Sequence, residues 1–157
     1  MAIGDWVLLA YKVPREPSTP RIALWRALRR LGVAQVLDGL VALPADSRTR
    51  EQLEWLADDV VEAGGEASVW LARPGSVAQE RALATRMRNA VTIEYQAVVT
   101  DVRAAMAGPP GQRTRTLSRL GRELSRIRRR DYFQSEAREE ALAAVRELAG
   151  SVERLAA

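Results

Sequence analysis

The first 73 residues alternate between short continuous apolar runs and stretches in which apolar residues recur with helical spacing. A short continuous apolar run is typical of a strand buried on both faces, and apolar residues three or four positions apart indicate an amphipathic helix. The pattern predicts strands at residues 6–11, 33–37, 40–44 and 67–72, and helices at residues 20–31 and 47–63. The predicted order is therefore strand, helix, strand, strand, helix, strand.

The ends of these elements carry their own signals. Thr19, which precedes a proline, is predicted to be the N-cap of the first helix, and Ser47 is predicted to cap the second. Gly32 marks the end of the first helix. Asp38-Gly39 lies between two apolar runs, which predicts a β-hairpin.

This element order predicts an α+β fold with a ferredoxin-like βαββαβ unit. Right-handed crossovers would place both helices on one face of a four-stranded antiparallel sheet. We assign this unit to a first domain, residues 1–73.

Residues 74–157 show only helical spacing. A long helix is predicted over 76–107, followed by a helical hairpin of residues 112–130 and a last helix that begins near Ser135. The last helix has a heptad-like stripe, which suits either pairing within the chain or a coiled coil between chains. Its members are Ala141, Val145, Leu148, Val152 and Leu155.

Four tryptophans fall in the predicted α+β domain. Trp6 and Trp70 lie in predicted strands, and Trp25 and Trp55 lie in the two helices. We expect the four indole rings to share the core of this domain. Stacking of nucleic-acid bases on exposed indoles is the alternative.

Composition removes several classes of chemistry. The 157 residues include no cysteine and no histidine, which excludes disulfides, thiolate or imidazole metal sites and every Ser-His or Cys-His catalytic pair. We expect no catalytic residue, no metal, no cofactor and no enzymatic activity. No apolar run reaches the length of a membrane span, and the first residues do not resemble a signal peptide. A cytoplasmic protein that does not engage membranes is expected.

Charge is distributed unevenly. The chain has 24 basic and 20 acidic residues, and 23 of the basic residues are arginine. Residues 1–73 have a net charge of −1 and residues 74–157 a net charge of +5. Residues 113–130 alone contain eight arginines against the single acid Glu123. Such a cluster is typical of a surface that binds polyanions, or of a solvated helix face.

Six of these arginines share the side of the predicted helix opposite its apolar stripe. Guanidinium groups bind phosphates with paired hydrogen bonds, so we predict a nucleic-acid-binding face. Its members are Arg115, Arg119, Arg122, Arg126, Arg129 and Arg130. A solvated face paired in part with acids of the last helix is the alternative.

A second arginine group surrounds the first loop and helix. Arg15 lies in the loop, Arg21 in the first helical turn and Arg26 one turn later. Free N–H groups and the positive end of the helix dipole favour anions at this position. We predict that Arg15, Arg21 and Arg26 bind an oxyanion such as a phosphate; a purely solvated helix face is the alternative.

A series of short segments forms a distinctive pattern along the chain. The first is residues 11–32, and the later ones are Asp38-Gly39, Leu43-Pro44, Leu53-Glu54-Trp55-Leu56, Gly64-Gly65-Glu66-Ala67 and Arg130-Asp131-Tyr132-Phe133. Taken in order, these segments extend over nearly the whole chain, and they resemble the N-terminal domain of the ChrB chromate-resistance regulators. The resemblance implies transcriptional control of chromate resistance and DNA binding. Full-length members of that family carry a second, C-terminal domain that this sequence does not contain.

We therefore expect a non-enzymatic DNA-associated regulator that acts as a homodimer, with an oxyanion such as chromate competing for arginine sites. A protein-interaction module that partners a separate domain, without DNA binding, is the alternative. A degenerate nuclease is a third hypothesis. The nucleases that share this fold carry a metal-binding acid after the first strand, whereas residues 12–15 here are Lys-Val-Pro-Arg.

Overall fold

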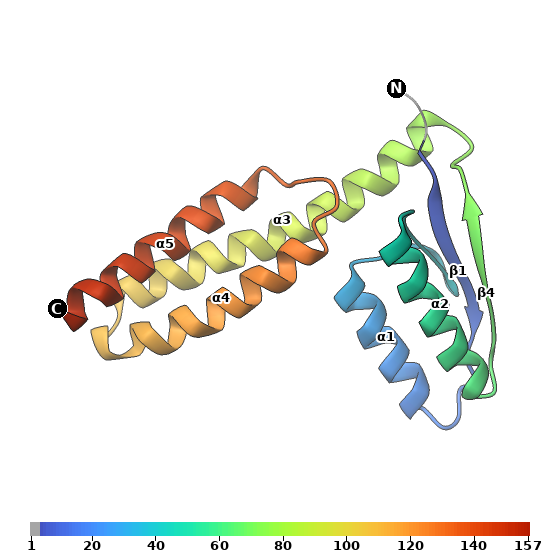
Figure 1. Ribbon diagram of the computed structural model, residues 1–157, viewed down its shortest axis with the longest axis horizontal. Coiled ribbons are helices and arrows are strands. Elements are labelled where there is room, and N and C mark those ends of the chain that lie inside the picture. Colours follow the sequence, from blue (N-terminus) through green and yellow to red (C-terminus); the bar gives the residue numbers. More distant parts are fainter. Residues whose placement is uncertain (1–3) are drawn as a thin grey trace. The chain divides into compact units, whose positions relative to one another are not determined.

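The computed structural model describes residues 4–157, which form two compact units, one ending at Arg86 and the other beginning at Met87 (Figure 1). The first unit contains a four-stranded sheet in the order β2-β3-β1-β4. Every neighbouring pair of strands is antiparallel. The strands are β1 (Trp6–Lys12), β2 (Ala34–Leu37), β3 (Leu40–Pro44) and β4 (Glu66–Ala72).

Two helices cover one face of this sheet (Figure 1). They are α1 (Thr19–Leu31) and α2 (Ser47–Glu62). Each follows a strand and returns to another strand, which gives the order β1-α1-β2-β3-α2-β4. This arrangement confirms the predicted α+β fold and ferredoxin-like order.

Alternation along the strands sets which residues face the helices. Val7 and Leu9 of β1 are fully buried, and Leu9 lies opposite Val41 of β3. These side chains and the buried residues of the helices form the core. The helical contribution comes from Leu24, Leu28, Leu53 and Val60.

Three of the four tryptophans lie outside this core, so the prediction of a shared tryptophan core was wrong. Trp6 is buried, but Trp25, Trp55 and Trp70 are 57%, 62% and 60% exposed. On each helix a leucine close to the tryptophan occupies the inward position, and Trp70 pairs with Leu8 on the sheet face that alternates away from Val7 and Leu9.

The N-caps also differ from the prediction. Asp46, not Ser47, caps α2: its Oδ1 accepts the Thr49 N–H at 2.7 Å, and Thr49 Oγ1 accepts the Asp46 N–H at 3.0 Å. The hydrogen bond from the Thr49 N–H is the largest cause that lowers the pKa of the Asp46 carboxyl, although desolvation opposes the effect. Ser18, not Thr19, is the N-cap of α1, and Gly32 ends that helix with φ of 72° as predicted.

The hairpin predicted at Asp38-Gly39 joins β2 to β3. Gly39 has φ of 76°, and a Cβ at this position would lie 2.5 Å from the carbonyl oxygen of Tyr11. The Tyr11 N–H donates to the Gly39 carbonyl at 2.8 Å. Glycine is therefore required here by both the backbone conformation and the close approach of β1.

Helix α3 (Val77–Ala107) runs through the division between the two units. Glu80, in its first turn, accepts hydrogen bonds from Trp6 Nε1 at 3.0 Å and from the Gly4 N–H at 2.9 Å. Arg86 donates to the carbonyl of Gln35 in β2. These contacts bind the start of α3 to the sheet, and the first compact unit ends at residue 86.

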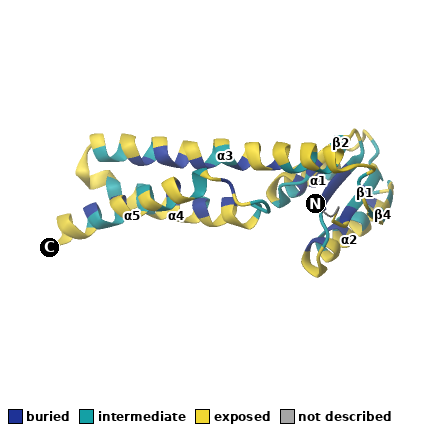
Figure 2. Ribbon diagram, turned by 90° about the horizontal axis from the view of Figure 1, so that it is seen from above, coloured by how far each residue is buried: buried dark blue, intermediate teal, exposed yellow. Residues whose placement is uncertain are grey.

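The second unit is a bundle of the rest of α3 with α4 (Arg113–Arg129) and α5 (Ala137–Ala156). A short 3-10 helix, η1 (Pro110–Gln112), precedes α4. Figure 2 shows the buried positions of α3 on the side toward α4 and α5. The fully buried side chains include Tyr95, Leu120, Ile127, Ala141 and Leu148. Because Ala141 and Leu148 belong to the stripe of α5, that stripe packs largely within the chain, whereas Leu155 is 53% exposed.

Two polar contacts fasten this bundle. Tyr95 donates a hydrogen bond to Asp131 Oδ2 at 2.8 Å, and Asp131 Oδ1 accepts the Ser135 N–H at 3.0 Å. Burial, the hydrogen bond and the Asp131 charge raise the pKa of the Tyr95 hydroxyl. Arg113 donates to the Met106 carbonyl at 2.9 Å and to the buried Ser151 hydroxyl at 2.7 Å. The end of α3 is thereby tied to α4 and α5.

Candidate nucleic-acid interface

Helix α4 has a buried face, two flanks and an outward face. Leu120, Leu124 and Ile127 point into the bundle core. At about 100° per residue, one flank carries Arg119 and Arg130, and the other carries Arg128. Ion pairs place the first flank beside α3, because the partners of Arg119 and Arg130 belong to that helix.

Arginines on the flank of α4 that faces α3 form ion pairs within the bundle. Arg130 contacts Glu94 of α3 at 2.7 Å, and its side chain is only 14% exposed. Arg119 lies 3.3 Å from Asp101, and Arg126 lies 3.5 Å from Glu123 within α4 itself. Arg130 is thus withdrawn from the surface on which it was predicted, while Arg119 and Arg126 remain exposed in weaker pairs.

The remaining three predicted residues, Arg115, Arg122 and Arg129, form what we name the outer arginine ridge. All three are exposed, and within residues 4–157 none of them has an ion pair. They are seven positions apart, so their side chains leave the helix within about 40° of one another. Their Cα atoms span about 21 Å at 1.5 Å per residue. The ridge is a line of three uncompensated positive charges.

Small residues lie beside this ridge. Ser118, Gly121 and Ser125 line a shallow surface pocket of about 680 Å³ together with Arg122, Arg126 and Arg129. A Cβ added at Gly121 would meet no atom within 4 Å, so the backbone of α4 is open there. Serine hydroxyls and arginines are the side chains that commonly donate to phosphate oxygens. Sequence reasoning missed these three residues, although their spacing of three and four positions matches the helix repeat.

The three arginines of the predicted oxyanion group do not line the pocket between α1 and α2. Arg15, Arg21 and Arg26 are all exposed. Arg21 and Arg26 leave α1 about 140° apart, since five residues separate them. The pocket of about 340 Å³ between α1 and α2 is lined by Arg30 and Asp59 with apolar residues, and by none of the three.

A cation–π contact occupies another arginine of α1. The Arg29 guanidinium lies 4.9 Å from the ring centroid of Trp25. Because both side chains are exposed, this contact covers part of the indole face on the helix surface.

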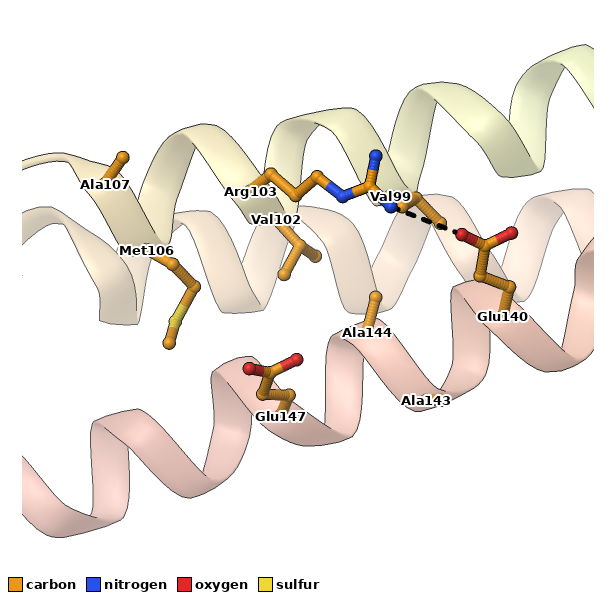
Figure 3. A pocket seen from close by; sticks show the side chains of 9 residues that line it. All are labelled: Val99, Val102, Arg103, Met106, Ala107, Glu140, Ala143, Ala144 and Glu147. Carbon is orange, nitrogen blue, oxygen red and sulfur yellow. Dashed lines mark hydrogen bonds and ion pairs between the residues drawn. The ribbon is translucent and has the colours of Figure 1, made fainter.

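A second surface feature is an open groove of about 550 Å³ between α3 and α5. Figure 3 shows Val102, Met106 and Ala144 along it, with the Arg103–Glu140 ion pair at one side. That pair measures 3.5 Å and is mostly exposed. The groove therefore combines an apolar floor with charged edges.

Within residues 4–157, no group of three or more acidic side chains is placed to hold a metal ion. No helix in the same range combines the length and apolarity needed to cross a bilayer.

Comparison with known proteins identifies relatives. A family model described as "Protein ChrB, N-terminal" matches residues 21–107, which is more than half of the chain. Protein ChrB of Cupriavidus metallidurans is 30% identical over 136 residues, covering 84% of this chain and 41% of that protein. The chain thus spans about two fifths of the length of this curated relative. No solved structure matches the chain. The chain belongs to the ChrB N-terminal family.

Proposed function

We propose that this protein is a non-enzymatic, DNA-associated transcriptional regulator linked to chromate resistance. The observation that carries the proposal is the outer arginine ridge, in which three exposed guanidinium groups have no acidic partner among the described residues. Family membership supports the link to chromate resistance, because the matching relative is named for ChrB.

The ridge suits contact with phosphates rather than readout of bases. Arginine forms paired, charge-assisted hydrogen bonds with phosphate oxygens. A span of about 21 Å along one helix allows several phosphates to be contacted at once. Ser118 and Ser125 supply neutral donors next to the charges.

The test is fluorescence anisotropy with a labelled duplex from upstream of the gene and a scrambled duplex, at several salt concentrations. Replacing Arg115, Arg122 and Arg129 together by glutamine removes three phosphate contacts. The slope of log affinity against log salt concentration should become shallower by about 2.7.

A charge-matched control separates the ridge from general electrostatics. Arg81, Arg146 and Arg154 are exposed and lie on other helices. Their combined replacement by glutamine lowers the net charge by the same three units as the ridge variant. The slope of log affinity against log salt concentration should nevertheless stay nearly unchanged. Equal effects of the two triple variants, or no binding by the unaltered protein at low salt, would refute the proposal.

Chromate is proposed to weaken the complex by competing for arginines. Titration with chromate at constant ionic strength should release the native duplex, and sulfate serves as the control anion. A ligand can shift this equilibrium only if it binds the DNA-free protein more tightly than the complex. Equal release by both anions would contradict selective competition. The homodimer stays a prediction, which sedimentation of the free protein and the complex tests.

The groove between α3 and α5 favours a second candidate function, a protein-interaction module that binds a separate partner domain. Its floor contains Val102 and Met106, and its edge carries Glu147. Complex formation on a sizing column that is insensitive to salt, and lost on Ala143→Arg, would support this function. Ala143 is exposed and lines the groove, so the substitution blocks the surface without entering the core.

A further inference from the structure

A small, open polar pocket lies where the end of α4 meets the start of α5. Its volume is about 320 Å³, and its lining consists of Ser125, Arg128, Arg129 and Arg138. Three of the four lining residues are arginines, and none is acidic. Glu136 and Glu139 are close to Arg138 in sequence but do not line the pocket.

The three guanidinium groups have no ion-pair partner within the described residues. This distinguishes them from Arg119, Arg126 and Arg130, whose charges are balanced by acids. Arg138 is partly buried, and its Nε atom is fully buried without a hydrogen-bond acceptor. Hydrogen bonds within the described residues therefore leave this guanidinium only partly satisfied.

Asp131 lies close to the same end of the bundle and is already engaged. It accepts the Tyr95 hydroxyl at 2.8 Å and the Ser135 N–H at 3.0 Å. The charges of Arg138 and Arg128 both act on the Tyr95 hydroxyl, where they oppose the rise in its pKa.

We propose that Ser125, Arg128, Arg129 and Arg138 form a binding site for one tetrahedral oxyanion with two negative charges. Three guanidinium groups can each donate two hydrogen bonds to oxygens of the anion, and the Ser125 hydroxyl can donate one more. The position of Arg138 in the first turn of α5 adds the positive end of a helix dipole. The same chemistry fits a free anion such as phosphate or sulfate and the phosphate group of a nucleic acid.

This site is distinct from the predicted group of Arg15, Arg21 and Arg26, and it shares only Arg129 with the outer arginine ridge. Binding of a free anion would not depend on DNA. If the occupant is a DNA phosphate, the inference rests on the proposed function, and the experiment separates the two sources.

The first arm is calorimetric titration of the full chain with inorganic phosphate and with sulfate at constant ionic strength. We expect one anion per chain. Arg128→Gln and Arg138→Gln should each weaken binding about tenfold or more, because each removes a pair of charge-assisted hydrogen bonds. Arg146→Gln, an exposed change elsewhere on α5, should leave the affinity unaltered.

The second arm repeats the duplex titration with the same variants. Arg128 is exposed, so Arg128→Gln keeps the test valid even if Arg138→Gln perturbs folding, which far-UV circular dichroism would reveal. A free-anion affinity that falls in the two site variants supports the site as a free-oxyanion site. Duplex affinity that falls at least fivefold in Arg128→Gln but not in Arg146→Gln, without free-anion binding, supports it as a phosphate site for DNA.

The outcomes also separate this inference from the proposed function. Phosphate binding without any duplex binding would keep the oxyanion site and remove the DNA-associated role. Two results together would overturn the oxyanion site. The first is that free anions fail to bind, and the second is that duplex binding is lost in the outer-ridge variant but kept in Arg128→Gln and Arg138→Gln. Equal anion affinity in all variants would overturn it as well.

Discussion

Replacing Tyr95 by phenylalanine tests how much the polar contact at the centre of the bundle contributes to stability. Tyr95 is fully buried, and its hydroxyl donates to Asp131 Oδ2 at 2.8 Å. Phenylalanine keeps the ring, so no large cavity forms. A hydrogen bond to a charged acceptor contributes about 1.5–3 kcal/mol. Asp131 retains the Ser135 N–H, so we expect a loss near 1.5 kcal/mol, the lower end of that range.

The two units can be followed separately. All four tryptophans precede residue 86, so tryptophan fluorescence reports on the first unit. Helical circular dichroism reports on both units, so a change in its transition without a change in the fluorescence transition reports on the second unit. For a unit of about 70 residues, a loss of about 1.5 kcal/mol lowers the midpoint of thermal unfolding by about 6–12 °C. Only the helical transition of Tyr95→Phe should move by this amount.

Tyr11→Phe provides the matched control. Tyr11 lies in β1 and is partly exposed, and in the described part of the chain its hydroxyl has no hydrogen bond. Its replacement should move neither transition by more than about 2 °C, as expected for a surface change. A shift below 2 °C for Tyr95→Phe, or equal shifts of both transitions, would show that the contact does not stabilise the bundle as reasoned.

Further predictions concern the pH dependence of stability, the N-cap of α2, the turn at Gly39 and the hydrogen bonds of Arg113. Because folding raises the pKa of Tyr95 above its ordinary 10.0, its contribution is complete below that pH and declines as pH rises further; Tyr95→Phe should flatten helical stability at alkaline pH. Asp46→Ala should cost the first unit about 1 kcal/mol by tryptophan fluorescence, whereas Asp46→Asn should keep most of the cap. Since folding lowers the pKa of Asp46, its ionic contribution is present above 3.8 and is lost as pH falls through the folded-state value; the asparagine variant should lack that acid dependence. Gly39→Ala should destabilise the first unit by about 2–3 kcal/mol, and an unchanged urea midpoint would contradict the steric argument. Arg113→Met should destabilise the second unit by about 2 kcal/mol, because it leaves the Ser151 hydroxyl buried without its hydrogen-bond partner. Thermal unfolding followed by circular dichroism measures this loss, and an unchanged stability would show that Arg113 does not hold this hydrogen bond.

Sequence patterns located the elements well where the signal is local. The apolar runs and the Asp38-Gly39 turn specified the strands of the sheet, and Gly32 specified the end of α1. The cap of α2 was misplaced by one residue because Asp46 and Ser47 are both good N-caps. The choice is decided three residues later: Thr49 can bond back to Asp46, whereas Arg50 has no acceptor to offer Ser47.

The site was harder to predict because it depends on neighbouring helices. Helical spacing grouped six arginines of α4. However, Glu94 of α3 pairs with Arg130 and holds it away from the surface, and Asp101 of α3 pairs with Arg119. A single helix does not reveal which of its flanks meets which neighbour. Arg128 was left out for the same reason, since its relation to α5 arises only when the hairpin closes.

The continuity of α3 decides how this protein can be dissected. The family match ends at residue 107, where α3 also ends, so α4 and α5 lie beyond it. A fragment cut at that point would retain the whole matched segment and yet expose the apolar stripe that the hairpin covers. That stripe consists of Val91, Tyr95, Val98, Val99 and Val102. Such a fragment should self-associate, and cutting at residue 86 instead would leave broken helix ends with four unpaired carbonyls and four unpaired N–H groups. Separately expressed halves should therefore overlap along α3, and the matched segment should be produced together with the hairpin.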